Sequence, residues 1–265
     1  MKIYNFYSGS KGNCTYVTDG ETSILIDAGG CLKRIRENLE ELGDNLNNIK
    51  GIFITHEHSD HTKALFNLTK KYDCRIFTTL ETARAICTPT YSVAMSDCRR
   101  VACSIMTVKT EKSYEIGSLI VKPFSTPHDA VSSVGFVVES TKDKTSLAYA
   151  TDIGYISEDI AKNMLGVKNV IIEANHDIEM LKNGPYPEHL KIRILSEKGH
   201  LSNADCAYFI KKLVENGTKS ILLAHLSEEN NTPIEARRAV ESELCGFDVA
   251  LGVANPYSRV EMEIF

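Results

Sequence analysis

Short apolar runs and amphipathic segments alternate along the first part of the chain. Three runs rich in β-branched and aromatic residues, KIYNFYS, CTYVT and SILIDA, predict strands. The segment CLKRIRENLEELG predicts a helix that ends at Gly43. Its apolar residues recur at helical spacing: Leu32, Ile35, Leu39 and Leu42. The next run, GIFIT, predicts a buried strand, and we expect Ser59 to cap the helix DHTKALFNLTKKY that follows it.

The same order, with strands first and helices later, returns in the second half of the chain. The runs SYEIG, LIVKPFST, SVGFVVES and TSLAYATD predict strands, whereas residues 88–112 show no clear pattern. Helices and strands then alternate. Helices are expected at SEDIAKNML, 187–198 and 202–216, and strands at NVIIEAN and SILLAHL. A last helix is expected from Pro233, and the tail SRVEMEIF is expected to form an edge strand. Two such halves predict an α/β fold in which two sheets pack face to face with helices outside.

Length and composition fit one large α/β domain over residues 1–265. Hydrophobic residues make up 43% of the chain and charged residues 25%, as in a soluble globular protein. No apolar run approaches the roughly 20 residues of a membrane helix, and the N-terminal segment lacks the apolar core of a signal peptide. The eight cysteines form no CxxC pair, which indicates reduced thiols and a cytoplasmic protein. The net charge of -5 argues against coating of nucleic acid by bulk charge but not against a local positive site.

The segment HEHSDH, at the junction of a predicted strand and a predicted helix, concentrates side chains that bind metals. His56, His58, Asp60 and His61 lie within six residues of one another. Side chains on such a turn can converge, and imidazole together with carboxylate suits zinc, manganese or iron. One segment cannot complete two metal sites, so further ligands are expected just after other strands.

Three polar residues meet that expectation. His128 follows VKPFSTP, Asp152 follows SLAYAT and His225 follows SILLA. Each has an ordinary alternative, because a lone histidine at a strand end usually makes a loop hydrogen bond, and Asp152 could cap the turn at Gly154. Their recurrence after successive strands favours a metal site.

These residues together resemble the signature of the metallo-β-lactamase superfamily, in which HxHxDH, His, Asp and His each follow a strand. The resemblance covers nearly the whole chain and implies a four-layered αββα sandwich. Further stretches, GSKGN, PHDA, EANHDIEML, GPYPEHLKIRIL, GHLSN and LAHLSEENN, are similar to one branch, the YycJ family, also called WalJ or VicX. That branch resembles DNA exonucleases that act from the 5′ end.

The resemblance implies two divalent metal ions, either zinc or manganese, with iron as a further candidate. The ligands implied for one ion are His56, His58, His128 and Asp152. The ligands implied for the other ion are Asp60, His61, Asp152 and His225, so Asp152 would bridge the two. Position 58 is histidine, whereas the flavodiiron redox branch usually has glutamate there, which favours hydrolysis.

The implied reaction is cleavage of a phosphodiester, and the expected enzyme is a 5′-to-3′ DNA exonuclease. A hydroxide held by both metals would attack the phosphate, and Asp60 would help to hold the attacking water. His200 in GHLSN is the candidate acid for the leaving 3′ oxygen, by resemblance to RNase Z and PhnP-type phosphodiesterases. The alternative for His200 is a residue that merely precedes a helix capped by Ser202 or Asn203. The expected partner is DNA, at its ends, and the oligomeric state stays open.

Four residues are candidates for substrate binding: Ser10, Asn13, His176 and Ser202. The first two lie in the glycine-rich turn at residues 7–13, whose backbone N–H groups could hold a phosphate. His176 follows the run NVIIEA, so both a role at the site and a loop hydrogen bond are open to it.

Other functions of the same fold remain as alternatives. A small-molecule phosphodiesterase, a thioesterase or a lactonase would use a similar metal centre, although the last two have no evident need for His200. A β-lactamase normally requires export. A non-catalytic regulatory protein would be expected to lose ligands, whereas all seven positions are present here.

Overall fold

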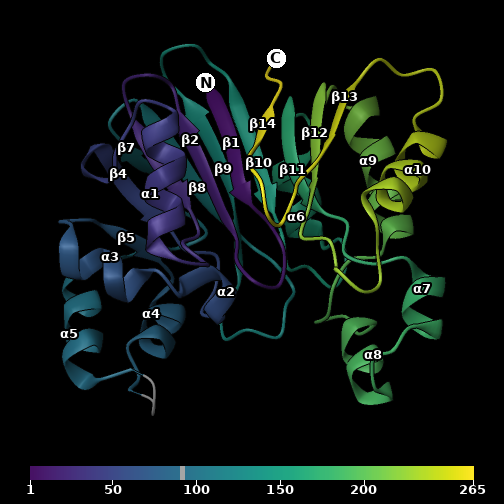
Figure 1. The fold of residues 1–265 in the computed structure, drawn as a ribbon. Coiled ribbons are helices and arrows are strands. Elements are labelled where there is room, and N and C mark those ends of the chain that lie inside the picture. Colours follow the sequence, from purple (N-terminus) through teal and green to yellow (C-terminus); the bar gives the residue numbers. More distant parts are fainter. Residues whose placement is uncertain (90–92) are drawn as a thin grey trace.

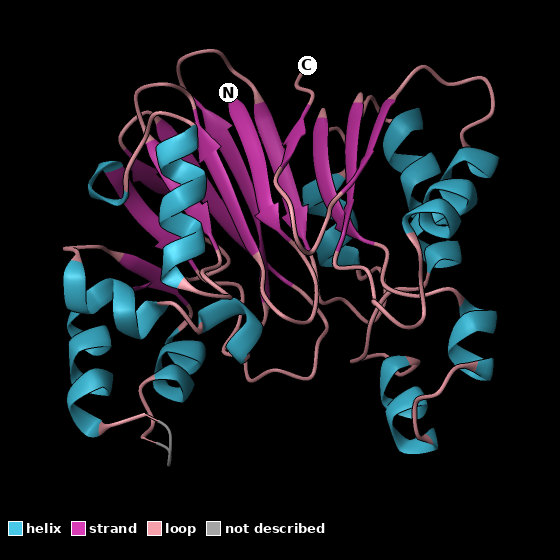
Figure 2. Cartoon of the chain, in the orientation of Figure 1, coloured by secondary structure: helices cyan, strands magenta, loops and turns pink. Residues whose placement is uncertain are grey.

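The computed structural model describes residues 1–89 and 93–265, which form two sheets of seven strands each (Figure 1, Figure 2). The first has the order β14-β1-β2-β3-β4-β5-β6, with β14 (Val260–Met262), β1 (Lys2–Tyr7), β2 (Cys14–Thr18), β3 (Ser23–Ile26), β4 (Ile49–Phe53), β5 (Ile76–Thr78) and β6 (Ile105–Thr107). The second has the order β13-β12-β11-β10-β9-β8-β7, with β13 (Ala250–Val253), β12 (Ser220–Ala224), β11 (Asn169–Glu173), β10 (Ser146–Ala150), β9 (Val134–Ser140), β8 (Leu119–Ser125) and β7 (Tyr114–Ile116).

Each sheet begins with antiparallel strands and continues with parallel ones. In the first sheet β1, β2 and β3 are antiparallel, and β3 to β6 are parallel. In the second sheet β7 to β10 are antiparallel, and β10 to β13 are parallel. Strands β8, β10, β11 and β12 therefore run in the same direction, and their carboxyl ends lie at one edge of the sheet, where ligand sites of α/β proteins form.

Helices cover the outer faces of both sheets (Figure 1). The helices that follow strands of the first sheet are α1 (Leu32–Glu41), α2 (Ser59–Thr62), α3 (Leu65–Lys71), α4 (Leu80–Ile86) and α5 (Met95–Ser104), with a short 3₁₀ helix at Leu46–Asn48. Those of the second half are α6 (Glu158–Met164), α7 (Ile178–Asn183), α8 (Glu188–Ile194), α9 (Asn203–Glu215) and α10 (Pro233–Glu243). One apolar cluster joins the first sheet to α1, α3 and α5, and another joins the second sheet to α6, α9 and α10. The predicted order of layers, with two sheets between helices, is confirmed.

A third apolar cluster fills the space between the two sheets. It combines residues of the first sheet, such as Ile24 and Phe53, with residues of the second, such as Val121 and Phe136. The Phe53 ring is stacked on Phe77 at 4.7 Å and meets the edge of Phe136 at 5.5 Å. This cluster fixes the sheets relative to each other, so side chains at the shared edge keep their spacing.

The tail forms the expected edge strand, because β14 pairs with β1 at the edge of the first sheet. The expected cap at Ser59 is wrong. Ser59 is the first residue of α2, and no side chain caps that helix. The long helix expected after it is divided into α2 and α3, because Ala64 N–H donates to Ala28 O while Asp60 O accepts from Asn13 N–H. Both backbone groups of a regular helical hydrogen bond are thus used by neighbouring loops.

Elements with little buried surface escaped the sequence pattern. In segment 88–112, which shows no clear hydrophobic pattern, the structure has α5 and β6. Helix α5 buries only Cys98 and Val101 among its ten residues. Residues 90–92 of that segment lie outside the described part of the chain. Among the described residues, no helix has the length and apolar character needed to cross a membrane.

We expect replacement of Phe53 by alanine to lower the free energy of unfolding by about 3–5 kcal/mol, because it opens a cavity between the sheets. Urea denaturation followed by linear extrapolation measures the change. The control is Phe247→Ala, at a ring that is 41% exposed, where a change within about 0.5 kcal/mol is expected. Equal losses in both variants would contradict a decisive contact between the sheets at Phe53.

Candidate metal centre

The seven predicted metal ligands are brought together at the edge where the strands end. The segment with His56 begins three residues after β4, His128 lies three residues after β8, and Asp152 lies two residues after β10. His225 directly follows β12. Three groups of side chains there have ligand atoms within 4.8 Å of one another. Their members are His56, His58 and His128; Asp60, His61, Asp152 and His225; and Asp152, Glu173, His200 and His225.

Three residues at this edge have left-handed backbone conformations. The φ angles are 60° at Asp27, 56° at Asp152 and 55° at His225. Residues other than glycine adopt this region rarely, at a cost of about 1–3 kcal/mol each. Such strain is typical of functional sites, and here it turns each side chain into the cluster at the end of a strand.

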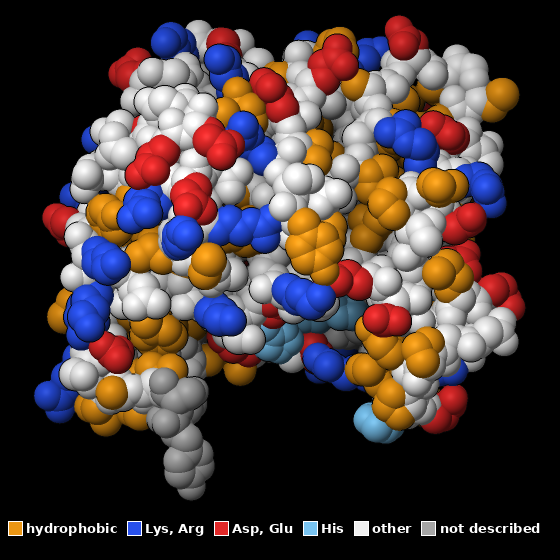
Figure 3. All heavy atoms as spheres, in the orientation of Figure 1, with side chains coloured by type: hydrophobic (Ala, Val, Ile, Leu, Met, Phe, Trp, Pro, Cys, Tyr) orange, Lys and Arg blue, Asp and Glu red, His pale blue; other side chains and the backbone are white. Residues whose placement is uncertain are grey.

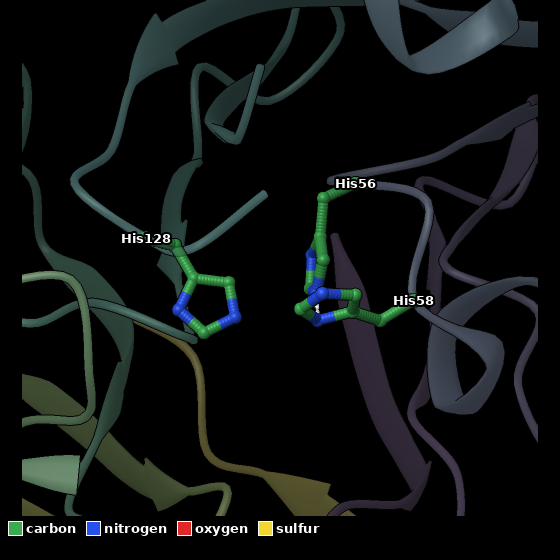
Figure 4. A group of neighbouring side chains, drawn as sticks. All are labelled: His56, His58 and His128. Carbon is green, nitrogen blue, oxygen red and sulfur yellow. Dashed lines mark hydrogen bonds between the residues drawn. The ribbon is translucent and has the colours of Figure 1, made fainter. Parts of the chain in front are cut away.

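The first group consists only of imidazoles. His56 Nε2 lies 3.0 Å from His58 Nδ1, and the rings of these two residues face the His128 ring across a small gap (Figure 4). His128 Nδ1 donates to Gly199 O at 3.2 Å, which leaves Nε2 with its lone pair toward the gap. Three imidazole nitrogens thus converge, from loops that follow strands of both sheets.

The second group adds carboxylates. His61 Nε2 lies 3.3 Å from both Asp60 Oδ2 and Asp152 Oδ2. His225 Nε2 lies 3.4 Å from Asp152 Oδ1. The same Asp152 oxygen is 3.9 Å from His128 Nε2 of the first group, so Asp152 lies between the two groups.

The loop before β2 contacts Asp60 and His61 of the second group through Asn13. Asn13 is fully buried, and its Nδ2 lies 3.3 Å from Asp60 Oδ2 and 3.0 Å from His61 Nε2. Asn13 N–H donates to Asp60 O, and Gly29 N–H donates to Asn13 O. A Cβ at Gly29 would lie only 1.7 Å from Asp60 O, so only glycine permits this approach.

Two buried carboxylates that the sequence reading missed hold the histidines in place. Asp27 Oδ2 accepts from His61 Nδ1 at 2.7 Å, and Thr55 donates to the same carboxylate. Glu173 Oε1 accepts from His225 Nδ1 at 2.9 Å and from His200 Nδ1 at 2.8 Å. These contacts occupy Nδ1 of each histidine, so the Nε2 atoms are the ones directed into the cluster, where His61 Nε2 also meets Asn13 Nδ2. The sequence feature that could have indicated these two carboxylates is an acidic residue at the end of an apolar run, in SILID for Asp27 and in NVIIE for Glu173.

The electrostatics of the cluster favour positive charge at its centre. Burial alone would lower the pKa of His225, but Asp152 and Glu173 outweigh it and raise the pKa to about 10. The pKa of His61 is likewise well above its usual range, because Asp27 and Asp152 outweigh burial. Burial opposes ionisation of Asp152, yet His225 and His61 hold its pKa well below the usual value. Metal binding would replace protons at these positions.

Two atoms at the centre lack hydrogen-bond partners. Within the described part of the chain, Asp152 Oδ2 and His225 Nε2 are both buried and unpaired, and their neighbours are close without forming hydrogen bonds. Such atoms are costly unless a further group satisfies them. The donors are imidazole nitrogens and carboxylate oxygens, so divalent zinc, manganese or iron ions fit the cluster.

His200 lies at the rim of the cluster. Its ring centroid is 5.3 Å from those of both His128 and His225, and 19% of its side chain is exposed. Ser202 caps α9, because its Oγ accepts from Asp205 N–H at 3.1 Å. The helix cap at Ser202, which was the alternative explanation for the position of His200, is therefore present. His200 nevertheless lies beside the candidate metal ligands.

The other candidate residues differ in exposure. Ser10 is exposed on the loop that carries buried Asn13. His176 is buried beside Ser202, and neither of its ring nitrogens has a hydrogen-bond partner among the described residues. Burial lowers the pKa of His176 to about 4, so the ring is neutral. The side-chain loop hydrogen bond expected as one alternative is absent there, and substrate contact by these residues stays a prediction.

We expect Asp27→Asn to weaken metal binding by about 10- to 100-fold, because His61 loses the carboxylate that orients its ring. Competition with a chelator measures the affinity. Asp44→Asn is the matched control. The Asp44 carboxylate also accepts side-chain hydrogen bonds, from Tyr16 and Ser23, but among the described residues it does not contact the candidate metal ligands. An unchanged affinity in the Asp27 variant would show that Asp27 does not act on the site.

Comparison with known proteins assigns the chain to a family. The family model described as "Beta-lactamase superfamily domain" matches residues 22–226. Exodeoxyribonuclease YycJ of Bacillus anthracis is 36% identical over 237 residues, 89% of this chain and 86% of that protein. Exodeoxyribonuclease WalJ of Streptococcus pneumoniae is 35% identical over 246 residues, 93% of this chain and 89% of that protein.

Solved structures support the fold. Zn(2+)-bound PqqB from Methylobacterium extorquens aligns with a TM-score of 0.69 at 15% identity, over 98% of this chain and 99% of that one. The short form of human tRNase Z aligns with a TM-score of 0.65 at 17% identity, over the full length of both chains. The chain therefore belongs to the β-lactamase superfamily, with the expected αββα metallo-β-lactamase fold, and to the family that includes YycJ and WalJ.

Proposed function

We propose that this protein is a metal-dependent phosphodiesterase that removes nucleotides from DNA in the 5′-to-3′ direction. The observation that carries the proposal is the pair of ligand groups joined at Asp152, with His200 beside them at the rim. The names of the relatives, exodeoxyribonucleases YycJ and WalJ, support DNA as the substrate.

Two divalent ions, zinc or manganese with iron as a third candidate, are the cofactors of this proposal. The residues that would hold one ion are His56, His58, His128 and Asp152. The residues that would hold the other are Asp60, His61, Asp152 and His225. When bound, the ions lower the pKa of water and offset the charge of a phosphodiester.

The chain's own groups have three tasks in this reaction. Asp60, whose side chain is 22% exposed, is the ligand that can also orient the attacking water. Asp27 and Glu173 keep protons on the outer nitrogens of His61 and His225, so the inner nitrogens stay available. Ser10, Asn13, His176 and Ser202 are the proposed contacts to substrate, of which Ser10 is the most open to solvent.

His200 is the proposed general acid. Its Nδ1 donates to Glu173 Oε1, so the ring is oriented and the other nitrogen can give a proton to the leaving 3′ oxygen. Glu173 is itself fixed, because its Oε2 accepts from Ile153 N–H at 2.8 Å. Because the His200 ring is fixed by these hydrogen bonds, its second nitrogen would deliver a proton at one defined position.

We also propose that residues 1–265 act as one domain. The ligand groups take His56, His58, Asp60 and His61 from the first sheet and His128, Asp152 and His225 from the second. Neither half of the chain could form this centre alone. Because both named relatives come from bacteria and DNA is the proposed substrate, we place the reaction in the cytoplasm.

The direct test is cleavage of 5′-labelled and 3′-labelled DNA, single- and double-stranded, with zinc or manganese added in turn. We expect stepwise release of nucleotides from the 5′ end and loss of activity in Asp60→Asn. Metal content is measured on the same samples. No cleavage by protein that holds two ions would overturn the nuclease proposal and direct the search to small phosphodiesters, thioesters and lactones.

Replacement of His200 by alanine should lower the turnover of DNA by roughly 10²–10⁴-fold, because the leaving 3′ oxygen then lacks an acid. The same variant should cleave bis(p-nitrophenyl) phosphate almost as fast as the wild type, since nitrophenolate leaves without a proton. Steady-state kinetics on both substrates gives the comparison.

The matched control for this test is His189→Ala, at an exposed histidine of α8, which should leave both activities unchanged. Equal losses on DNA and on the nitrophenyl ester in the His200 variant would assign His200 to metal binding or structure instead of proton transfer.

A further inference from the structure

Three loops from distant parts of the chain meet beside the metal ligands. They are residues 8–13 between β1 and β2, residues 225–232 after β12, and residues 254–259 between β13 and β14. Ser8 Oγ accepts from His225 N–H at 2.8 Å, and Ser8 N–H donates to Asn255 O at 3.2 Å. The first loop also carries Asn13, whose side chain touches Asp60. The meeting point is therefore built directly onto the metal centre.

One aromatic ring is held at the outer side of this meeting point by both other loops. Lys11 Nζ donates to Glu228 Oε2 at 2.8 Å and to the Tyr257 hydroxyl at 3.0 Å. The Tyr257 hydroxyl in turn donates to Glu228 Oε2. The ring nevertheless remains 60% exposed, with Lys11 Nζ 5.5 Å from its centroid. An exposed ring with a fixed hydroxyl keeps one face open to solvent in a defined orientation.

The arrangement differs from an ordinary surface tyrosine. Tyr208 on α9 is 62% exposed and has Lys212 Nζ 4.4 Å from its ring centroid, but these two residues are neighbours on one helix. Helix geometry alone accounts for that pair. Tyr257 is fixed by partners 246 and 29 positions away in the sequence, so the fold itself brings the three residues together.

The surface is hollowed where histidine side chains reach it (Figure 3). Figure 3 shows histidine side chains in a hollow at the lower edge of the molecule, with a lysine or arginine and a hydrophobic side chain directly above them. In the group formed by Lys11, Glu228 and Tyr257, the carboxylate of Glu228 offsets the charge of Lys11. The cluster is therefore better suited to the face of a ring than to a free phosphate.

We propose that Tyr257, fixed by Lys11 and Glu228, is a stacking platform for an unpaired DNA base next to the metal centre. The inference rests on the proposed nuclease function and adds the state of the substrate strand. Aromatic side chains bind single-stranded DNA through base stacking, which tolerates any sequence. A base that stacks on Tyr257 has left the duplex, so the substrate enters with a single-stranded or frayed end.

The test compares binding of two oligomers that share one backbone. The first is a 3′-fluorescein oligothymidylate with phosphorothioate linkages that slow cleavage. The second carries abasic tetrahydrofuran units in place of the nucleosides. Fluorescence anisotropy should give a Kd about 10-fold lower for the oligothymidylate with the wild type, as expected for one stacked base. In Tyr257→Ala the difference between the oligomers should disappear, whereas in Tyr257→Phe most of it should remain.

The matched control is Tyr208→Ala, which should keep the wild-type difference between the oligomers. Equal binding of both oligomers by the wild type, or an undiminished difference in Tyr257→Ala, would overturn the platform while DNA cleavage by the wild type still supported the nuclease. Absence of both DNA binding and DNA cleavage in the wild type would overturn the nuclease proposal, and the platform with it.

Discussion

Buried negative charge is the constraint on which the rest of this structure depends. Asp27, Asp152 and Glu173 are each at most 2% exposed, and an ionised carboxylate at such depth must be paired. The cost shows at Asp27, where burial raises the pKa although His61 and Thr55 act in the opposite direction. Asp27 and Glu173 are paired by imidazole N–H groups, whereas Asp152 keeps an oxygen without any hydrogen bond among the described residues. A cation bound at the centre would pair with the remaining oxygen of Asp152, and this would link the fold to the proposed chemistry.

The backbone meets this constraint through strained strand ends instead of long side chains. Left-handed conformations at Asp152 and His225 let the chain turn at once after β10 and β12. The close approach at Gly29 lets Asp60 and Asn13 share backbone hydrogen bonds. Because both sheets supply the proposed ligands, metal binding would also hold the sheets together and contribute to folding. The inter-sheet contact at Phe53 lies shortly before the histidine segment, so packing between the sheets would also support the proposed metal ligands.

The sequence predicted those parts of the site that are written as a local pattern. HEHSDH concentrates four polar ligands in six residues, and His128, Asp152 and His225 each stand out after an apolar run. Asp27 and Glu173 were missed because a single acidic residue at a strand end is common, and only the folded chain shows that each faces a histidine. The cap at Ser59 was wrongly expected because the hydrogen bonds that divide the helix come from residues 13 and 28. Contacts between distant segments leave no periodic trace in a sequence, and the Tyr257 cluster is of the same kind.

The exposure of the ligands indicates the side from which a substrate approaches. His56, His61, Asp152 and His225 are buried, whereas His58, Asp60 and His200 are partly open. A phosphate that approached the centre would therefore meet Asp60 and His200 first. These are the two residues that, in the proposed reaction, contact the attacking water and the leaving oxygen. The buried ligands lie away from solvent, where the charge of a bound metal would be least screened. A group that only binds metal can be enclosed, but a group that transfers a proton to substrate must stay accessible. The partial exposure of His200 is consistent with the proposed proton transfer, while Glu173 fixes the orientation of the ring from the interior.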